Sequence, residues 1–275
     1  MTLPNFLIIG AAKSGTTSLY HYLRQHPDIF MSPIKEPNFY SDAGDLVPNA
    51  IRERSAYEQL FAGANGQRAI GEASVRYLNA VGGIDRIHAD LDGVRLIASL
   101  RQPAERAYSS YLQRSASGRE TQRAEDALQP GNYSFETSRY YPRLRRYYDR
   151  FPRGQIKVIL FDELGANPQC VVRELFRFLD VDEDFIADTR LRHNSGVAPR
   201  SRFLNRLFDS GMRLFRPIVP QRLLSKGLAT RLRRPLLRKA DAMPPFLRRR
   251  LTDQYRDDVL ATAELIGRDL SHWLA

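Results

Sequence analysis

Short apolar runs alternate with helical patterns along most of the chain. Four runs rich in Ile, Leu and Val show little polar alternation, which is typical of strands buried on both faces of a parallel sheet. These predicted strands span Asn5–Gly10, Arg68–Glu72, Val94–Leu100 and Gln155–Phe161. The predicted helices span Ser14–Gln25, Gly83–Leu91, Pro103–Ser115, Phe135–Arg150, Pro168–Leu179 and Pro245–Gly267. Strands that alternate with helices predict an α/β fold with a mostly parallel central sheet flanked by helices.

Local signals mark several helix ends. Pro27 stops the first helix, Pro103 suits the first turn of another, and Asn167 is a suitable N-cap before Pro168. The region from Arg200 to Ala242 has helical patterning and no predicted strand. We therefore predict one domain over residues 1–275, with residues 200–243 as a basic helical elaboration near its C-terminal end.

Charge is concentrated in that elaboration. The 275 residues carry a formal net charge of +11, yet Arg200 to Arg250 contain fifteen Lys or Arg and only two acidic residues. This balance of +13 leaves −2 for the remaining 224 residues. A basic segment attracts acidic acceptors or lipid head groups. No nucleic-acid motif is present and aromatic residues do not interleave with the basic run, so we expect no nucleic-acid partner.

Phe203–Arg216 is amphipathic when it is projected as a helix. Large apolar residues occupy one half of the wheel and four arginines occupy the other. Such a helix either contacts an anionic membrane surface peripherally or packs on the core and shows its arginines to water.

The composition favours a cytoplasmic protein. Hydrophobic residues make up 43% of the chain, enough for a substantial core. The N-terminal residues lack the features of a signal peptide, and no apolar window is long enough to span a membrane. The single cysteine, Cys170, excludes an internal disulfide and is expected to be a small buried hydrophobe.

The stretch FLIIGAAKSGTTSLYHYLRQHP, from Phe6 to Pro27, predicts a P-loop-like anion site after the first strand. A strand, a glycine-containing turn and a helix N-terminus together direct backbone N–H groups toward one anion. Gly15 permits close backbone approach, and Ser14, Thr16 and Thr17 offer hydroxyl donors. Thr16 stands where a Walker A loop has its lysine, and Lys13 is the cation within the loop.

A second anion site is predicted where the Val94–Leu100 strand ends. A nucleoside-triphosphate enzyme of the P-loop type needs an aspartate at such a position to hold Mg²⁺. Here the residue is Arg101, which can grip a phosphate through a bidentate fork, and Ser109 lies about two helical turns further on. Arginine at this position favours direct phosphate binding without a metal.

Six segments resemble those of sulfotransferases that use 3′-phosphoadenosine 5′-phosphosulfate (PAPS), in the bacterial branch akin to heparan sulfate sulfotransferases. Two of them look like the family's 5′-phosphosulfate loop and 3′-phosphate motif: IIGAAKSGTTSLYHYLRQHPDI and LIASLRQPAERAYSSY. The others are SPIKEPNFYSD, IGEASVRYL, NSGVAPRSRFL and GRDLSHWL. Together they span most of the chain apart from about Asn205–Ala240.

The resemblance implies a role for each matching residue. Lys13 would contact the oxygen between phosphate and sulfate, and Ser14 to Thr17 would cradle the 5′-phosphate. Arg101 and Ser109 would hold the 3′-phosphate, with Arg200 of the late loop as a further phosphate ligand. Glu36 matches the glutamate that serves the family as general base, and no metal is required. Ala73 replaces a lysine of the animal heparan enzymes, so their full charge network does not carry over.

Alternative bases are less favoured. His26 lies beside Pro27 at a helix end and is expected to act as a C-terminal helix partner. His193 is expected to belong to loop structure, and Lys35 is expected to be a surface charge.

The sequence therefore predicts a sulfotransferase that moves a sulfuryl group from PAPS to a hydroxyl, or less favourably an amine, of a carbohydrate-containing acceptor. Two alternatives stay open. A small-molecule P-loop kinase would need Mg²⁺ and a triphosphate, against which Thr16 and Arg101 count. A non-catalytic protein that binds a phosphonucleotide or an anionic surface would not require Glu36.

Overall fold

The computed structural model describes residues 2–42, 47, 50–190, 197–199, 237–239 and 241–275. The chain divides into two compact units. The first unit comprises Met1–Pro103, Arg139–His193 and Tyr255–Ala275, and the second comprises Ala104–Ser138 and Asn194–Gln254. The predicted elaboration at 200–243, including Arg200 and Phe203–Arg216, lies outside the described residues except for 237–239 and 241–243.

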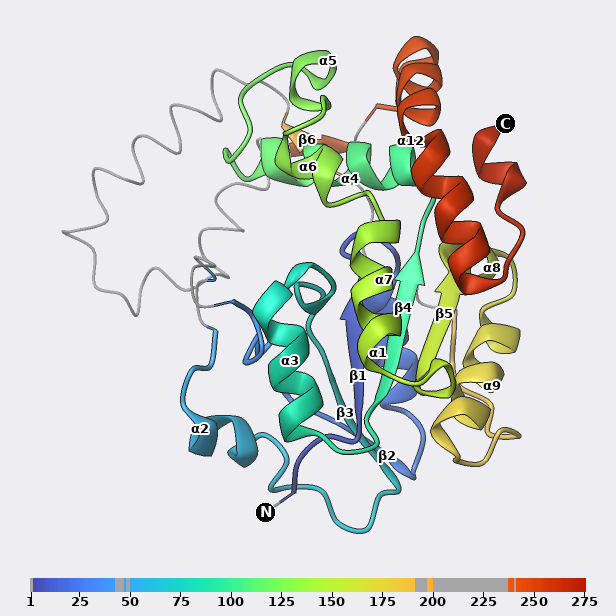
Figure 1. The fold of residues 1–275 in the computed structure, drawn as a ribbon. Coiled ribbons are helices and arrows are strands. Elements are labelled where there is room, and N and C mark those ends of the chain that lie inside the picture. Colours follow the sequence, from blue (N-terminus) through green and yellow to red (C-terminus); the bar gives the residue numbers. More distant parts are fainter. Residues whose placement is uncertain (1, 43–46, 48–49, 191–196, 200–236, 240) are drawn as a thin grey trace, which may run out of the picture. The chain divides into compact units, whose positions relative to one another are not determined.

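A five-stranded parallel sheet forms the centre of the first unit (Figure 1). Its order is β2-β3-β1-β4-β5. The strands are β1 (Phe6–Gly10), β2 (Ile29–Met31), β3 (Ala69–Ala73), β4 (Arg95–Leu100) and β5 (Ile156–Leu160). After β1 the chain builds one side of the sheet through β2 and β3 and then the other through β4 and β5. The carboxyl ends of β3, β1 and β4 therefore meet where the strand order reverses, the usual position of a ligand in such sheets.

Helices cover both faces of this sheet. The helices of the first unit are α1 (Thr16–Leu23), α2 (Arg54–Gln59), α3 (Val81–Asp90), α7 (Tyr141–Arg150), α8 (Phe161–Ala166) and α9 (Pro168–Leu179). Figure 1 shows α3 and α7 together in front of the sheet and α1 behind it, where α1 contacts α9. Phe6 and Ile8 of β1 join Leu19 of α1 and Phe176 of α9 in one buried apolar cluster. The α/β fold with a parallel sheet is thereby confirmed.

The predicted strands and the observed ones agree in place and differ at their ends. The sequence missed β2, because three residues are too few to show a period. Phe161 begins α8 instead of ending β5. The expectation of no strand in 200–242 is wrong, since β7 (Leu237–Lys239) pairs antiparallel with β6 (Val197–Pro199). A strand of three residues gains its identity from its partner, and this partner lies about forty positions away in the sequence.

One helix prediction needs correction. The predicted helix at Phe135–Arg150 is interrupted, with α6 (Tyr133–Glu136) ending before α7, whose first turn contains Pro142. Proline has no N–H for a helical hydrogen bond and its ring clashes with the carbonyl four residues earlier, so a helix can have Pro142 in its first turn but does not continue through it from α6. By contrast, α9 begins and ends as predicted, and the Asn167 side chain accepts a hydrogen bond of 3.1 Å from the Cys170 N–H.

The second unit contains α5 (Ala124–Ala127), α6, β6 and β7. It also contains α4 (Pro103–Ala116) from Ala104 onward and residues 245–254 of α12 (Pro245–Ile266). Arg106 of α4 is fully buried, and its Nη1 donates to Thr137 Oγ1 (2.7 Å) and to Ser138 Oγ (2.9 Å). These bonds tie α4 to the end of α6 within the unit.

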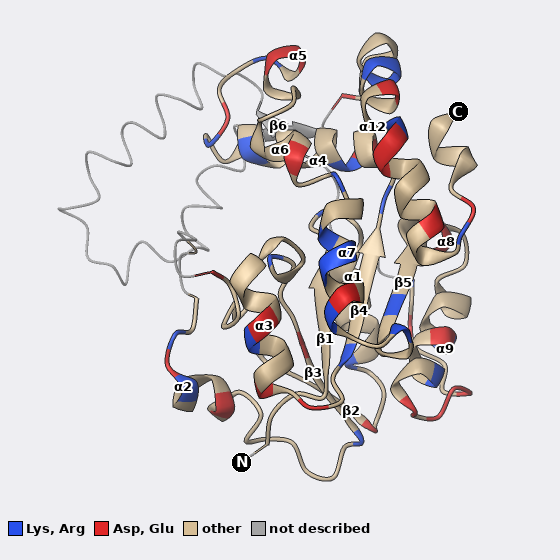
Figure 2. Ribbon diagram, in the orientation of Figure 1, with Lys and Arg blue, Asp and Glu red and all other residues tan. Residues whose placement is uncertain are grey.

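Cys170 is exposed, so the expectation that it is buried is wrong. It lies on α9 beside an apolar stripe formed by Val171, Val172, Leu175, Phe176 and Leu179, and it points away from that stripe. Figure 2 shows basic and acidic residues together on α3, α7 and α9. Within the described residues, no helix combines the length and apolar character that crossing a membrane requires.

Candidate active site

The loop between β1 and α1 is anchored to β4 on both of its sides. The Ala11 N–H donates to Ser99 O (2.8 Å), and the Ser99 hydroxyl donates to Ser14 O (2.5 Å). Ser99 is a fully buried residue of β4. The loop is therefore held in one shape by the neighbouring strand.

Ser14 supplies an observation that points to a ligand. Its side chain is fully buried, yet its Oγ has no hydrogen-bond partner in the described part of the chain. Buried polar groups nearly always have a partner, and a missing one calls for an explanation such as a bound ligand. The α1 N-terminus beside it has no capping side chain and no acidic residue in its first turn. This combination fits an anion such as a phosphate.

Gly15 is required in this loop for two reasons. Its φ of 83° lies in the left-handed region. A Cβ at this position would lie 2.7 Å from Leu164 Cδ2 and 3.1 Å from Phe161 Cδ2. The loop therefore approaches the start of α8 more closely than any side chain allows.

We predict that Gly15→Ala lowers the free energy of unfolding by more than the matched change Gly66→Ala. Gly66 has a similar φ of 81°, and a Cβ at that position would have nothing within 4 Å. The left-handed backbone costs about 1–2 kcal/mol at either position, and only Gly15→Ala adds steric crowding. Chemical denaturation of both variants measures the difference. Equal losses would show that the close approach to Leu164 and Phe161 relaxes without strain.

Arg101 lies at the carboxyl end of β4 and faces Phe161. Its guanidinium carbon is 4.9 Å from the centre of the Phe161 ring, a cation–π distance. The same ring borders Gly15, so Arg101 and the β1–α1 loop share a neighbour. The Arg101 backbone is clamped by Tyr140, whose Oη donates to Arg101 O (2.8 Å) and accepts from Arg101 N (3.2 Å). The structure thus brings Arg101 near the Lys13–Thr17 loop.

Residues of the C-terminal segment stabilise this corner. Asp258 Oδ2 accepts the Tyr140 N–H at 2.7 Å, and Gln102 Nε2 donates to Trp273 O at 3.0 Å. Trp273 is itself buried and donates through Nε1 to Asp162 Oδ2. Burial raises the pKa of the Asp258 carboxyl to about 6, against the opposing effect of the Tyr140 N–H. The segment GRDLSHWL therefore packs beside the strand end that carries Arg101.

Glu36 lies on a loop fastened to the end of β3. The Glu36 N–H donates to Ala73 O (2.9 Å), and the Asn38 Nδ2 donates to Glu36 O (2.7 Å). The side chain keeps 40% of its surface exposed. Because β3 lies next to β1 in the sheet, this loop and the Lys13 loop emerge from adjacent strand ends.

Left-handed backbone conformations concentrate in these two loops. Four non-glycine residues of the described chain have a positive φ: Lys13, Glu36, Asn38 and Asp180. Asp180 is an ordinary helix C-cap. The other three flank the expected reaction centre, and such strain, about 1–3 kcal/mol each, is characteristic of functional sites.

The structure shows the surroundings of two residues that the sequence analysis did not favour as the base, Lys35 and His26. Lys35 was expected to be a surface charge, but its Nζ is paired with Glu36 Oε1 at 3.0 Å and its side chain is only 20% exposed. His26 is buried, with Nε2 bonded to Asp182 O and Nδ1 accepting the Asp28 N–H. Both ring nitrogens are therefore engaged, and His26 has a structural role.

The described structure does not test the roles predicted for Ser109, Arg200 and His193. Ser109 is a half-buried residue of α4 in the second unit, whereas Arg101 belongs to the first. Arg200 and His193 lie outside the described residues. Their predicted roles stay predictions.

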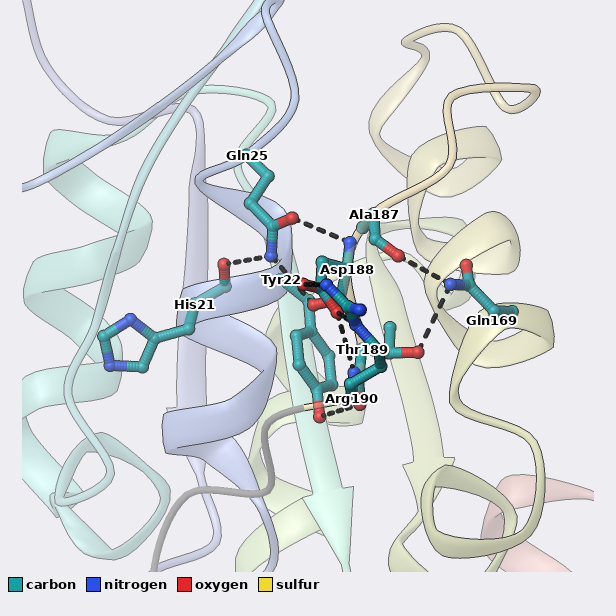
Figure 3. A network of polar contacts seen from close by, with 8 residues as sticks. All are labelled: His21, Tyr22, Gln25, Gln169, Ala187, Asp188, Thr189 and Arg190. Atoms are coloured by element: carbon teal, nitrogen blue, oxygen red, sulfur yellow. Dashed lines mark hydrogen bonds and ion pairs between the residues drawn. The ribbon is translucent and has the colours of Figure 1, made fainter.

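The chain that leads toward this late loop is firmly attached. Figure 3 shows Gln25 exchanging two hydrogen bonds with the Asp188 backbone, Nε2 to O at 3.1 Å and N to Oε1 at 2.8 Å. Tyr22 Oη donates to Thr189 O, and Gln169 Nε2 donates to Ala187 O. Residues 187–190 are therefore held between α1 and α9.

Three residues that support the site were not predicted from the sequence. Ser99 anchors the β1–α1 loop, Phe161 contacts both that loop and Arg101, and Glu72 lies buried next to Ala73, which holds the Glu36 loop. Ser99 and Glu72 each fall at or near the end of a buried apolar strand. A polar residue at such a position is the signal that could have found them.

Comparisons with known proteins agree with this geometry. A family model described as the sulfotransferase domain matches residues 3–196. A sulfotransferase from Alicyclobacillus acidocaldarius, known from its crystal structure, is 32% identical, with a TM-score of 0.76 and full coverage of both chains. Human carbohydrate sulfotransferase 15 is 28% identical over 98% of this chain and 54% of its own length. Human bifunctional heparan sulfate N-deacetylase/N-sulfotransferase 2 is 28% identical over 65% of this chain and 22% of its own. The chain thus spans about half or less of these two curated relatives.

Proposed function

The chain belongs to the sulfotransferase domain family, and we propose that it transfers a sulfuryl group from PAPS to a hydroxyl group of a glycan-type acceptor. The observation that carries the proposal is the buried Ser14 Oγ, which has no partner in the described chain and lies in a strained loop that contains Lys13 and shares the neighbour Phe161 with Arg101. That arrangement fits a nucleotide with phosphates at both ends of its ribose. The two curated relatives named above carry carbohydrate or heparan sulfate in their names, which supports a glycan as acceptor.

Each residue has one task in the proposed reaction. When bound, PAPS supplies a sulfuryl group whose sulfur–oxygen bond to the 5′-phosphate breaks. Glu36 takes the proton that the acceptor hydroxyl loses as its oxygen attacks sulfur. Lys13 stabilises the negative charge that remains on the phosphate oxygen. Ser14, Gly15, Thr16 and Thr17 hold the 5′-phosphate, and Arg101, Ser109 and Arg200 hold the 3′-phosphate.

Lys35 modifies the proposed base. Its ammonium group donates a hydrogen bond of 3.0 Å to Glu36 Oε1 and so holds the carboxylate in one orientation. Half of the carboxylate, Oε2, is left for the acceptor proton. A cytoplasmic location, with peripheral membrane contact through Phe203–Arg216, completes the proposal.

Calorimetric titration tests the proposal against its rivals. We expect adenosine 3′,5′-bisphosphate to bind equally well with and without Mg²⁺, and ATP to bind weakly. A P-loop kinase would instead bind ATP in a Mg²⁺-dependent manner and ignore the bisphosphate. Transfer from radiolabelled PAPS to a panel of unsulfated glycosaminoglycan oligosaccharides then separates an enzyme from a non-catalytic binding protein.

A further inference from the structure

We propose that Glu72 is the positioning residue of the Glu36 loop, because its buried carboxyl group lies among Tyr57, Ser74 and Tyr77, the three residues that hold loop residues 38 to 40. The inference rests on the proposed role of Glu36 as general base. It concerns residues of the first unit alone, and Glu72 itself does not touch the reacting atoms.

Glu72 occupies an unusual place for a carboxyl group. It lies on β3 opposite Leu7 of the central strand β1, and none of its surface is exposed. A buried carboxyl group destabilises the fold unless hydrogen bonds compensate it, so its presence calls for a reason. Its immediate neighbour, Ala73, accepts the backbone N–H of Glu36.

Three hydroxyl groups converge on this carboxyl group. Tyr57 Oη donates to Glu72 Oε1 at 3.4 Å. The hydroxyls of Tyr77 and Ser74 also act on the Glu72 carboxyl group and lower its pKa, against the larger effect of burial. Oε2 has no partner at normal hydrogen-bond distance in the described chain, which leaves that oxygen able to carry a proton.

Each of these hydroxyl-bearing residues also holds one residue of the loop. Ser74 Oγ accepts the Asn38 N–H at 3.0 Å, and Tyr77 Oη accepts the Tyr40 N–H at 3.3 Å. The Tyr57 ring stacks on Phe39, with ring centres 4.3 Å apart and planes 10° from parallel. A hydroxyl that donates to Glu72 turns its lone pairs toward the loop N–H groups. Glu72 therefore orients the acceptors for two N–H groups and the ring that carries Phe39.

The loop needs such support because its backbone is strained. Glu36 has a φ of 63° and Asn38 a φ of 55°, and Asn38 Nδ2 donates back to Glu36 O. Left-handed conformations of this kind persist only where the surroundings fix them more than once. Ser74, Tyr57 and Tyr77 hold residues 38, 39 and 40, respectively. By holding these three residues they also orient the side chain of Glu36.

Glu72 also makes this support sensitive to pH. Burial, the largest effect, raises the pKa of Glu72 to about 7, while the hydroxyls of Tyr77, Ser74 and Tyr57 and the Lys35 charge oppose it. The titratable groups that face Glu72 are thus Tyr57, Tyr77 and Lys35, and the charge of Glu72 in turn acts on Tyr40. An ionised carboxylate only accepts, whereas the protonated form donates one bond and competes with the hydroxyls. The loop is therefore held more tightly above about pH 7 than below it.

Amide hydrogen exchange, resolved by NMR, tests the inference. We expect Ser74→Ala to lower the protection of the Asn38 amide alone and Tyr77→Phe to lower that of the Tyr40 amide alone, each by roughly tenfold. Glu72→Leu should lower both. Glutamine has nearly the same shape as glutamate, so Glu72→Gln provides a folded variant if Glu72→Leu fails to fold. Glu72→Gln should also lower the protection of both amides, by a smaller factor than Glu72→Leu.

The control is Asp258→Asn, which alters another buried carboxyl group of the first unit that binds a backbone N–H. It should leave the Asn38 and Tyr40 amides unchanged. Unchanged protection at both amides in Glu72→Gln and Glu72→Leu would overturn the inference. This readout does not depend on sulfuryl transfer. If the amides respond as expected while Glu36→Gln still transfers, only the role of Glu36 as base fails.

The pH profile provides a second readout that a merely structural role would not move. Transfer from PAPS to the oligosaccharide panel should rise through about pH 7 in the parent protein and lose that step in Glu72→Gln. Affinity for adenosine 3′,5′-bisphosphate should be the same in both. If the rise in transfer near pH 7 persisted in Glu72→Gln, another group would be responsible for it, and the claim that Glu72 makes the loop sensitive to pH would be wrong.

Discussion

Replacing Glu36 with glutamine should lower sulfuryl transfer by at least about 100-fold and leave the affinity for adenosine 3′,5′-bisphosphate unchanged. The amide keeps the shape of the carboxylate but cannot accept the acceptor's proton. Glu36 sits on the β3 side of the site, whereas the predicted nucleotide ligands lie after β1 and β4. Initial rates with radiolabelled PAPS and calorimetry with the bisphosphate measure the two quantities separately.

The matched control for this change is Glu174→Gln. Glu174 is paired with Lys157 at 2.8 Å and is 45% exposed, close to the 3.0 Å and 40% of Glu36 with Lys35. The Glu174→Gln variant should transfer the sulfuryl group at the rate of the parent protein. If Glu36→Gln also transferred at a near-normal rate, the base would have to be another residue, although the nucleotide site could still be correct.

Replacing Lys13 with methionine should lower transfer by about 100- to 1000-fold, the usual effect of removing one group that stabilises developing charge. Methionine keeps the unbranched stem, and Lys13 already has a left-handed φ of 72°, so the backbone strain is the same in both. The loss should fall mainly on kcat, with a smaller weakening of bisphosphate binding, because the charge on the phosphate oxygen grows during the reaction.

Lys157→Met serves as the control, since Lys157 is a half-buried lysine of β5 that pairs with Glu174. It should retain both transfer and binding. Equal losses in transfer and in bisphosphate affinity for Lys13→Met would show that Lys13 binds the ground state and the transition state alike. That outcome would reassign Lys13 from stabilising the leaving group to holding the nucleotide.

The different effects of the two variants distinguish the two halves of the proposed site. Glu36 and its loop are supported by β3 and by the hydroxyls around Glu72, whereas Lys13 and its loop are supported by Ser99 of β4. A binding-only protein would lose bisphosphate affinity in Lys13→Met and show no consequence of Glu36→Gln. The pair of experiments therefore tests the reaction as well as the ligand.

Much of the fold was predictable because it depends on neighbouring residues. The apolar runs at Asn5–Gly10 and Val94–Leu100 locate β1 and β4, and Asn167 and Pro168 mark the start of α9. The loop after β1 was recognisable from Gly15 and its hydroxyl-bearing neighbours. These features are local, since strand period, capping and turn chemistry involve residues only a few positions apart.

The sequence was least informative where packing and pairing in the folded chain decide a residue's role. Cys170 is exposed because the adjacent Val171 and Val172 take the buried face of α9. β7 exists through its pairing with β6. Lys35 gained a partner, and His26 lost its candidacy as base because Asp182 and Asp28 occupy its ring nitrogens.

The sequence by itself thus determined the α/β class, and it predicts a phosphate-binding role for the Lys13 loop and for Arg101, which stands where a P-loop enzyme would have a metal-binding aspartate. Only the tertiary structure decided that Phe161 is a neighbour of both Gly15 and Arg101, and that the Glu36 loop is bonded to the end of β3 beside the buried Glu72. The physical reason is that sheet order brings strand ends together across about 60 to 90 positions of sequence, and the resulting burial and hydroxyl contacts carry no local signature.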